Sequence, residues 1–204
     1  MRDGFWMRLL ACALLLVSAA AIAADKAQSQ TSSGQPAKAD KTTNSSDLLL
    51  PPSEDLRRAW AEIGGKLVEM GQDFPEDKYD FKVQKDQRTF AETILHVAGD
   101  DFLAVSAIKG SPVGPDFHGE HPARSTYKTK ADVVKLLKDA VAAGAAVIQE
   151  QGDAGLDKAI FSPFTADPVR VSTLWWSVIE DDGEHYGQLV VYYRANNIVP
   201  PRSR

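Results

Sequence analysis

A long helical pattern covers residues 168–195, which read PVRVSTLWWSVIEDDGEHYGQLVVYYRA. Asp167 and Pro168 predict its start, because an acid can cap the first turn and proline lacks only an N–H that would have no partner there. Side chains three and four residues apart share one stripe of this helix, which consists of Leu174, Val178, Asp181, His185, Gln188 and Tyr192. The stripe is partly polar although it faces inward, which predicts a polar centre inside the fold.

Three further stretches, about residues 53–70, 90–108 and 131–151, also place apolar side chains three and four residues apart. Thr89 and Thr129 stand directly before the second and third of them, where a hydroxyl group can cap the first turn. The alternation typical of strands is nearly absent. Four long amphipathic helices without a sheet predict an all-α fold, a four-helix bundle.

Local features add detail to this prediction. Ser53 is expected to cap the first helix and Gly71 to end it. Gly144 lies among alanines of the third helix and would allow close contact with a neighbouring helix. Residues 79–83 (YDFKV) are the one stretch that could be extended.

The beginning of the chain has the pattern of an export signal. Arg2 and Arg8 precede an apolar run, and Ala21-Ile22-Ala23 fits the small-x-small pattern of a cleavage site. The apolar run is shorter than the roughly 20 residues that span a bilayer. We expect residues 1–23 to be a cleaved signal peptide and the mature protein to be periplasmic or secreted, with no stable membrane anchor. An uncleaved anchor is the alternative.

Residues 24–47 are rich in Ser, Thr, Lys, Gln and Ala and contain no large apolar side chain. Such a segment cannot bury enough surface to offset its chain entropy, which predicts a disordered linker. Residues 48–204 are then expected to form one domain, long enough for a single core.

Charge and cysteine content exclude several function classes. The chain of 204 residues has 23 Lys and Arg against 28 Asp and Glu, a formal charge of −5, so it lacks the basic surplus of a nucleic-acid-binding protein. Cys12 is the one cysteine and lies within the predicted signal. The mature chain would therefore have no disulfide, no thiolate metal ligand and no cysteine nucleophile.

The strong metal ligands that remain are histidine and carboxylate. His185 follows Asp181 by four residues, and His96 precedes Asp100 by four, so each pair lies about one helical turn apart and could grip one ion. If the second and fourth helices are neighbours, His96, Asp181 and His185 could converge. Two imidazoles and one carboxylate suit a first-row divalent metal with open coordination positions. The alternative is that these histidines are surface or capped core residues.

Two segments resemble the DinB/YfiT-like family. Residues 78–82 (KYDFK) and 88–99 (RTFAETILHVAG) resemble the family's Y-x-F loop and the second-helix pattern F-x-E-x-x-x-H-x-A. Residues 184–194 (EHYGQLVVYYR) and 198–203 (IVPPRS) resemble its fourth-helix H-x-x-E-H-Y-G-Q/N motif and its G-I-V-P-P-S-S tail. The resemblance covers the chain from about residue 50 to its end.

The resemblance implies a four-helix bundle with one metal near its middle, held by three histidines. One comes from the second helix and two, four residues apart, from the fourth. These positions fall on His96, Asp181 and His185, so an aspartate occupies the middle position here. A carboxylate is a normal ligand of Zn, Ni, Mn or Fe, although the exchange makes the site more negative and could also mean that metal binding is lost.

Other side chains are candidates for a supporting or pocket-lining role. They are Asp100, Glu184, Tyr192, His118 and His121. The last two lie in a loop rich in proline and glycine, which could fold over the mouth of the bundle or lie free in solvent. No catalytic residue is singled out.

The resulting functional expectation is an exported, monomeric or homodimeric protein that binds one divalent metal. It would act on a small-molecule ligand or substrate, as a metal-dependent hydrolase or as one of the thiol-dependent transferases that the resemblance implies. The alternative is a non-catalytic metal- or ligand-binding protein, or a stress-associated bundle with a vestigial site.

Overall fold

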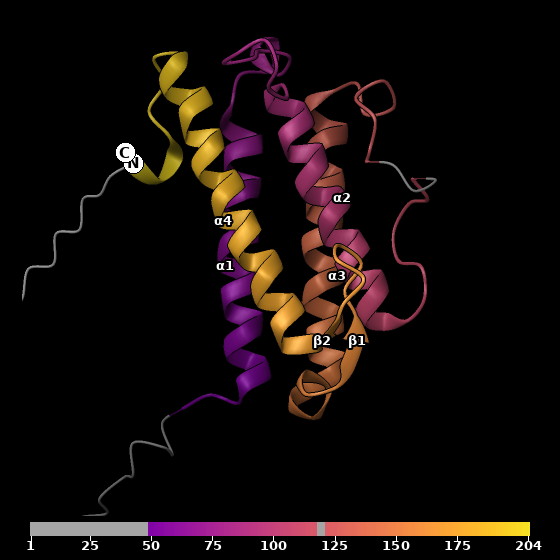
Figure 1. Ribbon diagram of the computed structural model, residues 1–204. Helices are drawn as coiled ribbons and strands as arrows, with labels where there is room; N and C mark the ends of the chain where they lie inside the picture. The colour runs from indigo at the N-terminus through magenta and orange to yellow at the C-terminus, as the bar shows by residue number, and fades with distance from the viewer. Residues whose placement is uncertain (1–48, 118–120) are drawn as a thin grey trace, which may run out of the picture. The chain divides into compact units, whose positions relative to one another are not determined.

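The structure is a computed structural model that describes residues 49–117 and 121–204. The predicted signal peptide, the predicted linker and His118 lie outside the described residues. Four long helices dominate the described part: α1 (Pro52–Asp73), α2 (Phe90–Lys109), α3 (Lys130–Leu156) and α4 (Val171–Ala195) (Figure 1). Two short 3-10 helices, η2 (Glu76–Lys78) and η3 (Pro201–Ser203), complete the helical elements. The predicted all-α four-helix bundle is confirmed.

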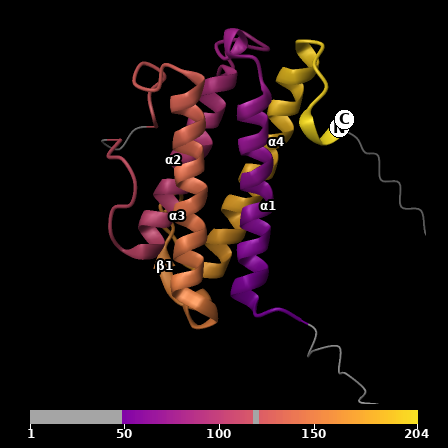
Figure 2. The same ribbon diagram turned by 180° about the vertical axis from the view of Figure 1, so that it is seen from behind.

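Each helix packs against two others. Both α1 and α2 pack against α3 and α4, whereas α1 touches α2 little and α3 touches α4 little. Figures 1 and 2 show the bundle from its two sides, with α4 on one side and α3 on the other. This arrangement makes α2 and α4 neighbours along the bundle, as convergence of the predicted metal ligands requires.

The connection between α2 and α3 is long because of the direction of these helices. In Figure 1 both α2 and α3 begin at the upper end of the bundle and run downward. The chain that leaves Lys109 must therefore return along the outside of the bundle before α3 begins at Lys130. The return path carries His121 back past the middle of α2.

The starts of α2 and α3 follow from their sequence. The hydroxyl group of Thr89 accepts from the N–H of Glu92, and the carboxylate of Glu92 accepts from the N–H of Thr89. Thr129 and Asp132 make the same reciprocal pair at the start of α3. Each box satisfies two N–H groups that the helix leaves without a partner, so both predicted caps are confirmed.

Two predicted boundaries are wrong. The fourth helix was predicted to begin at about Pro168, but α4 begins at Val171. Residues Pro168–Arg170 instead form strand β2, which pairs antiparallel with β1 (Ala159–Phe161). This short hairpin suits proline, which can occupy an edge strand without needing a ladder donor. The third helix continues past residue 151 to Leu156, across a kink where Gly152 has φ 55°.

The first helix also differs in detail from the prediction. Ser53 lies inside α1 rather than at its cap, because the helix begins at Pro52 and Pro51 occupies the cap position. The N–H and the hydroxyl group of Ser53 both donate to the carboxylate of Asp153 near the end of α3. Gly71 does not end the helix, which continues to Asp73. Residues 79–83 form a turn and irregular chain rather than a strand, with Tyr79 buried and its hydroxyl group donating to the carbonyl of Gly71.

The core consists of two clusters of buried apolar side chains. One contains stacked and tilted aromatic rings, including Phe74, Phe90 and Tyr193. The other contains Trp60 and Trp175, whose rings meet edge to face with centroids 5.1 Å apart. On α4, the buried residues of the tryptophan cluster extend as far as Val178, and those of the aromatic cluster start at Leu189. Asp181 and His185 lie between these two apolar regions.

Among the described residues, no helix combines the length and the apolar character that crossing a membrane requires.

Replacing Gly144 with Ala should lower the free energy of unfolding by about 1–3 kcal/mol. A Cβ atom at this position would overlap the indole ring of Trp60, which is fixed by its own hydrogen bond to the carbonyl of Val141. Gly65→Ala in α1 is the matched control, because a Cβ there meets nothing within 4 Å and should leave stability equal or higher. Urea unfolding of both variants measures the difference. Equal stability of Gly144→Ala and wild type would contradict the close contact.

Candidate metal centre

The structure brings His96 of α2 together with Asp181 and His185 of α4. One ligand atom of each lies within 4.8 Å of the others. His185 Nε2 is 3.4 Å from Asp181 Oδ2, and the rings of His96 and His185 meet edge to face with centroids 4.8 Å apart. These three side chains therefore surround a common point between the two helices.

His185 is held in one orientation. Its side chain is 7% exposed, and its Nδ1 lies 3.1 Å from Oε1 of Gln188, one turn further along α4. An amide oxygen can only accept, so this hydrogen bond requires the proton on Nδ1. The lone pair of Nε2 then points toward Asp181 and is free to bind an ion.

His96 is kept in the neutral form that a metal ligand must have. Burial is the largest cause, and the nearby charges of Arg88, His185 and His121 add to it, so that the pKa of His96 is lowered to about 3. Protons therefore compete weakly with a cation for this imidazole at neutral pH.

Asp100 and His121 lie against the other side of His96. Asp100 Oδ2 is 3.4 Å from His96 Nε2, and Asp100 Oδ1 is 3.5 Å from His121 Nδ1. His96 Nδ1 is 3.3 Å from His121 Nδ1. Ligand atoms of these three residues again lie within 4.8 Å of one another. The described residues thus contain two donor triads that share His96: the α4 triad (His96, Asp181, His185) and the loop triad (His96, Asp100, His121).

Two other candidates from the sequence lie elsewhere. Glu184 is exposed on α4 and belongs to neither triad. Tyr192 is buried, and its hydroxyl group donates to the carbonyl of Arg88, just before α2 begins. Tyr192 therefore holds the start of α2 in place and reaches neither donor triad.

A pair of buried acids, Asp101 and Asp182, was missed. Both side chains are nearly inaccessible, and neither carboxylate oxygen of Asp101 has a hydrogen-bond partner among the described residues. Burial raises the pKa of Asp101 well above its usual value, and the charge of Asp182 raises it further. Burial likewise raises the pKa of Asp182, as do the charges of Asp181 and Asp100. Both carboxyl groups are protonated over a range in which exposed aspartates are ionised.

Cavities reach both triads from outside. One of about 300 Å³ is lined by Asp100 and Asp181 together with Phe164, Ser177 and Val178. A second, of about 490 Å³, is lined by His96, His121 and several charged side chains that include Arg88 and Arg124. A small molecule could therefore reach an ion at either triad without unfolding of the bundle.

Of the comparisons with known proteins, the one with solved structures bears on the fold. No protein-family model matches the chain, and no curated protein matches it. Among solved structures, a DinB-like protein from Bacillus cereus ATCC 10987 superposes with a TM-score of 0.62 at 15% sequence identity. The match covers 72% of this chain and 95% of that protein. The chain therefore has a DinB-like fold.

Replacing Asp101 with Asn should raise the free energy of unfolding, increasingly as the pH rises above about 4. Because burial raises the pKa of this carboxyl group, the folded wild-type protein releases the proton only at a higher pH than the unfolded chain, which releases it near the ordinary pKa. When the unfolded chain alone releases this proton, the wild-type protein loses stability as the pH rises. The difference in free energy of unfolding between Asp101→Asn and wild type should therefore grow by up to about 1.4 kcal/mol per pH unit between the two pKa values.

Urea unfolding in the presence of a chelator, between about pH 4 and 7, measures this difference. The low pKa of His96 changes stability in the opposite direction, but it does so equally in both proteins. The exposed Asp77→Asn variant is the matched control and should run parallel to wild type. Parallel profiles for Asp101→Asn would mean that Asp101 is ionised in the fold.

Proposed function

We propose that this protein binds one divalent metal ion at the α4 triad and acts on a small molecule as a metal-dependent hydrolase or transferase. The observation that carries the proposal is the convergence of His96, Asp181 and His185 from two helices that are far apart in the sequence. We further propose that it acts outside the cytoplasm, on the strength of the export pattern in residues 1–23.

The donor set fits a first-row divalent ion. Ligand atoms about 2.0–2.1 Å from a tetrahedral ion lie about 3.3–3.4 Å from each other. The separation of His185 Nε2 and Asp181 Oδ2, 3.4 Å, agrees with that spacing. Two imidazoles and one carboxylate suit Zn, Ni, Mn or Fe and leave coordination positions for water or substrate. Once bound, such an ion supplies Lewis-acid chemistry, which lowers the pKa of water or a thiol and polarises a carbonyl group.

The surrounding side chains would orient the metal ligands and contact the bound molecule. Gln188 holds the imidazole of His185 in the tautomer that leaves Nε2 free. The cavity beside Asp181 offers the apolar surfaces of Phe164 and Val178 to a ligand whose polar end reaches the triad. Asp100, which borders the same cavity, is positioned to accept a proton from a bound molecule.

The second candidate function is a non-catalytic metal- or ligand-binding bundle, or a stress-associated bundle with a vestigial site. It is favoured by the position of Asp181, whose side chain is 45% exposed and whose one polar partner among residues 49–117 and 121–204 is His185. A ligand held so loosely would bind an ion more weakly than the third histidine of the family pattern. Turnover of a small ester, amide or thiol substrate that requires added metal separates the two candidates.

The full chain, purified without a histidine tag, should retain about one equivalent of divalent metal after dialysis against zinc. His96→Ala should retain none, because His96 belongs to both triads. Glu184→Gln is the matched control, since it removes an exposed acid next to His185 and should leave the metal content unchanged. Elemental analysis of folded samples, checked by circular dichroism, gives the result. Full metal content in His96→Ala would exclude this centre.

A further inference from the structure

We propose that the loop triad is a second, alternative position for the divalent ion, in which Asp100 and His121 replace Asp181 and His185 as partners of His96. The proposal rests on the proposed function in one respect, namely that His96 is the ligand common to both positions. It adds a ligand from the connection between α2 and α3, which the helical pattern of the family does not contain.

One ligand atom from each residue of the loop triad lies within 4.8 Å of the other two. His121 Nδ1 is 3.3 Å from His96 Nδ1 and 3.5 Å from Asp100 Oδ1, and both separations are close to the edge of a tetrahedron around a small divalent ion, about 3.3–3.4 Å. The other ring nitrogen of His96, Nε2, lies 3.4 Å from Asp100 Oδ2. Two imidazole nitrogens that face each other at this distance can share at most one proton, whereas an ion would engage both lone pairs and the carboxylate together.

The fold holds His121 against α2. A Cβ atom on Gly99 would lie 2.7 Å from Cδ of Pro122 and 3.4 Å from Nδ1 of His121. Glycine at this helical position therefore lets the returning chain approach the backbone of α2. Pro122 is buried in this contact, although His121 itself is exposed on its outer side.

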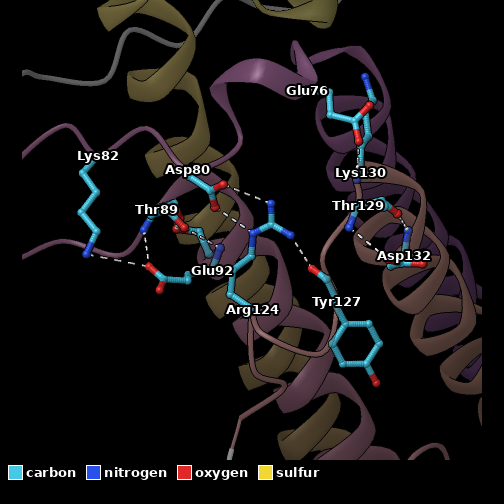
Figure 3. A network of polar contacts seen from close by, with 11 residues as sticks. Glu76, Asp80, Lys82, Thr89, Glu92, Arg124, Tyr127, Thr129, Lys130 and Asp132 are labelled. Atoms are coloured by element: carbon cyan, nitrogen blue, oxygen red, sulfur yellow. Dashed lines mark hydrogen bonds and ion pairs between the residues drawn. The ribbon is translucent and has the colours of Figure 1, made fainter.

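A second anchor lies just beyond His121 (Figure 3). The guanidinium group of Arg124 donates to both carboxylate oxygens of Asp80, at 2.8 and 3.2 Å, and also to the carbonyl of Tyr127. These bonds tie the returning chain to the connection between α1 and α2. His121 thus lies just before two anchored residues, Pro122 and Arg124, which reduces the entropy lost when it binds an ion.

The carboxylates of the two triads favour a cation. Asp100 belongs to the loop triad and Asp181 to the α4 triad, and the two lie close enough to influence each other. Asp100 is only 15% exposed, so water screens its charge poorly. A divalent ion at the loop triad would neutralise this carboxylate at short range.

The two triads share one imidazole, that of His96. A neutral imidazole has one nitrogen with a free lone pair, so His96 binds an ion at one position at a time. With the ion at one position, the two other donors remain free for a substrate or a proton. At the loop triad the ion would lie beside a cavity of about 430 Å³ whose lining is mainly apolar, with Phe102, Leu103, Val113 and Phe117. This points to a ligand with an apolar body and one metal-binding polar group.

Titration of four variants of the full chain with Co²⁺ tests the proposal, with d–d absorption reporting coordination and calorimetry giving stoichiometry. Asp181→Ala/His185→Ala leaves only the loop triad, and Asp100→Ala/His121→Ala leaves only the α4 triad. We expect wild type and both double variants to bind one equivalent and His96→Ala to bind none. Where a double variant does not fold, Asp181→Asn/His185→Gln or Asp100→Asn/His121→Gln replaces it.

Gly99→Ala sharpens the test, because it removes no donor and only pushes the chain at residues 121 and 122 away from α2. Added to Asp181→Ala/His185→Ala, it should weaken Co²⁺ binding at least about tenfold, as loss of outer-shell support does. In wild type, where the α4 triad remains, the same change should have little effect. Zn²⁺ added to Asp181→Ala/His185→Ala should also shift the imidazole NMR resonances of His121.

The outcomes separate this proposal from the proposed function. A folded Asp181→Ala/His185→Ala variant that binds no Co²⁺ overturns the loop position, and binding by Asp100→Ala/His121→Ala then upholds the α4 triad. Binding by the first variant and none by the second supports the loop position and overturns the α4 triad as the ion's site.

Discussion

The packing of α2 against α4 is the contact on which the centre depends. It sets His96 beside His185, with their ring centroids 4.8 Å apart. Burial then lowers the pKa of His96, which keeps its imidazole neutral, and raises the pKa values of Asp101 and Asp182. The polar interval on α4 lies between two apolar clusters that hold the helices together on both sides of it.

This centre lowers the stability of the fold. Asp101 is fully buried and lacks a hydrogen-bond partner among the described residues, and such a group lowers stability unless it is compensated. Acids with raised pKa values and a neutral histidine that converge beside a cavity are typical of functional sites. The aromatic cluster of Phe74, Phe90 and Tyr193 and the interlocked Trp60 and Trp175 supply packing that offsets this cost.

Much of the fold could be predicted from the sequence because its signals are local. The capping boxes at Thr89 and Thr129 depend on residues three apart, and helical periodicity repeats every turn. The hairpin before α4 was missed because strands of three residues are too short to show alternation. Asp182 was missed because neighbouring positions on a helix differ by about 100°, so which of Asp181 and Asp182 is buried depends on packing. Asp101 did carry a signal, since it falls on the apolar stripe of α2.

The position of His121 could not be predicted from the sequence, because an irregular connection has no repeating pattern of apolar residues that shows where its side chains lie. Its approach to His96 follows from the parallel course of α2 and α3 and from the absence of a side chain at Gly99. The most direct test of the centre is anomalous diffraction from crystals grown with zinc. We expect a peak about 2.0–2.2 Å from a nitrogen of His96 and from donors of one of the two triads. A zinc-loaded crystal with no peak beside His96, or with His96 and His185 turned away from each other, would show that the bundle has no such centre.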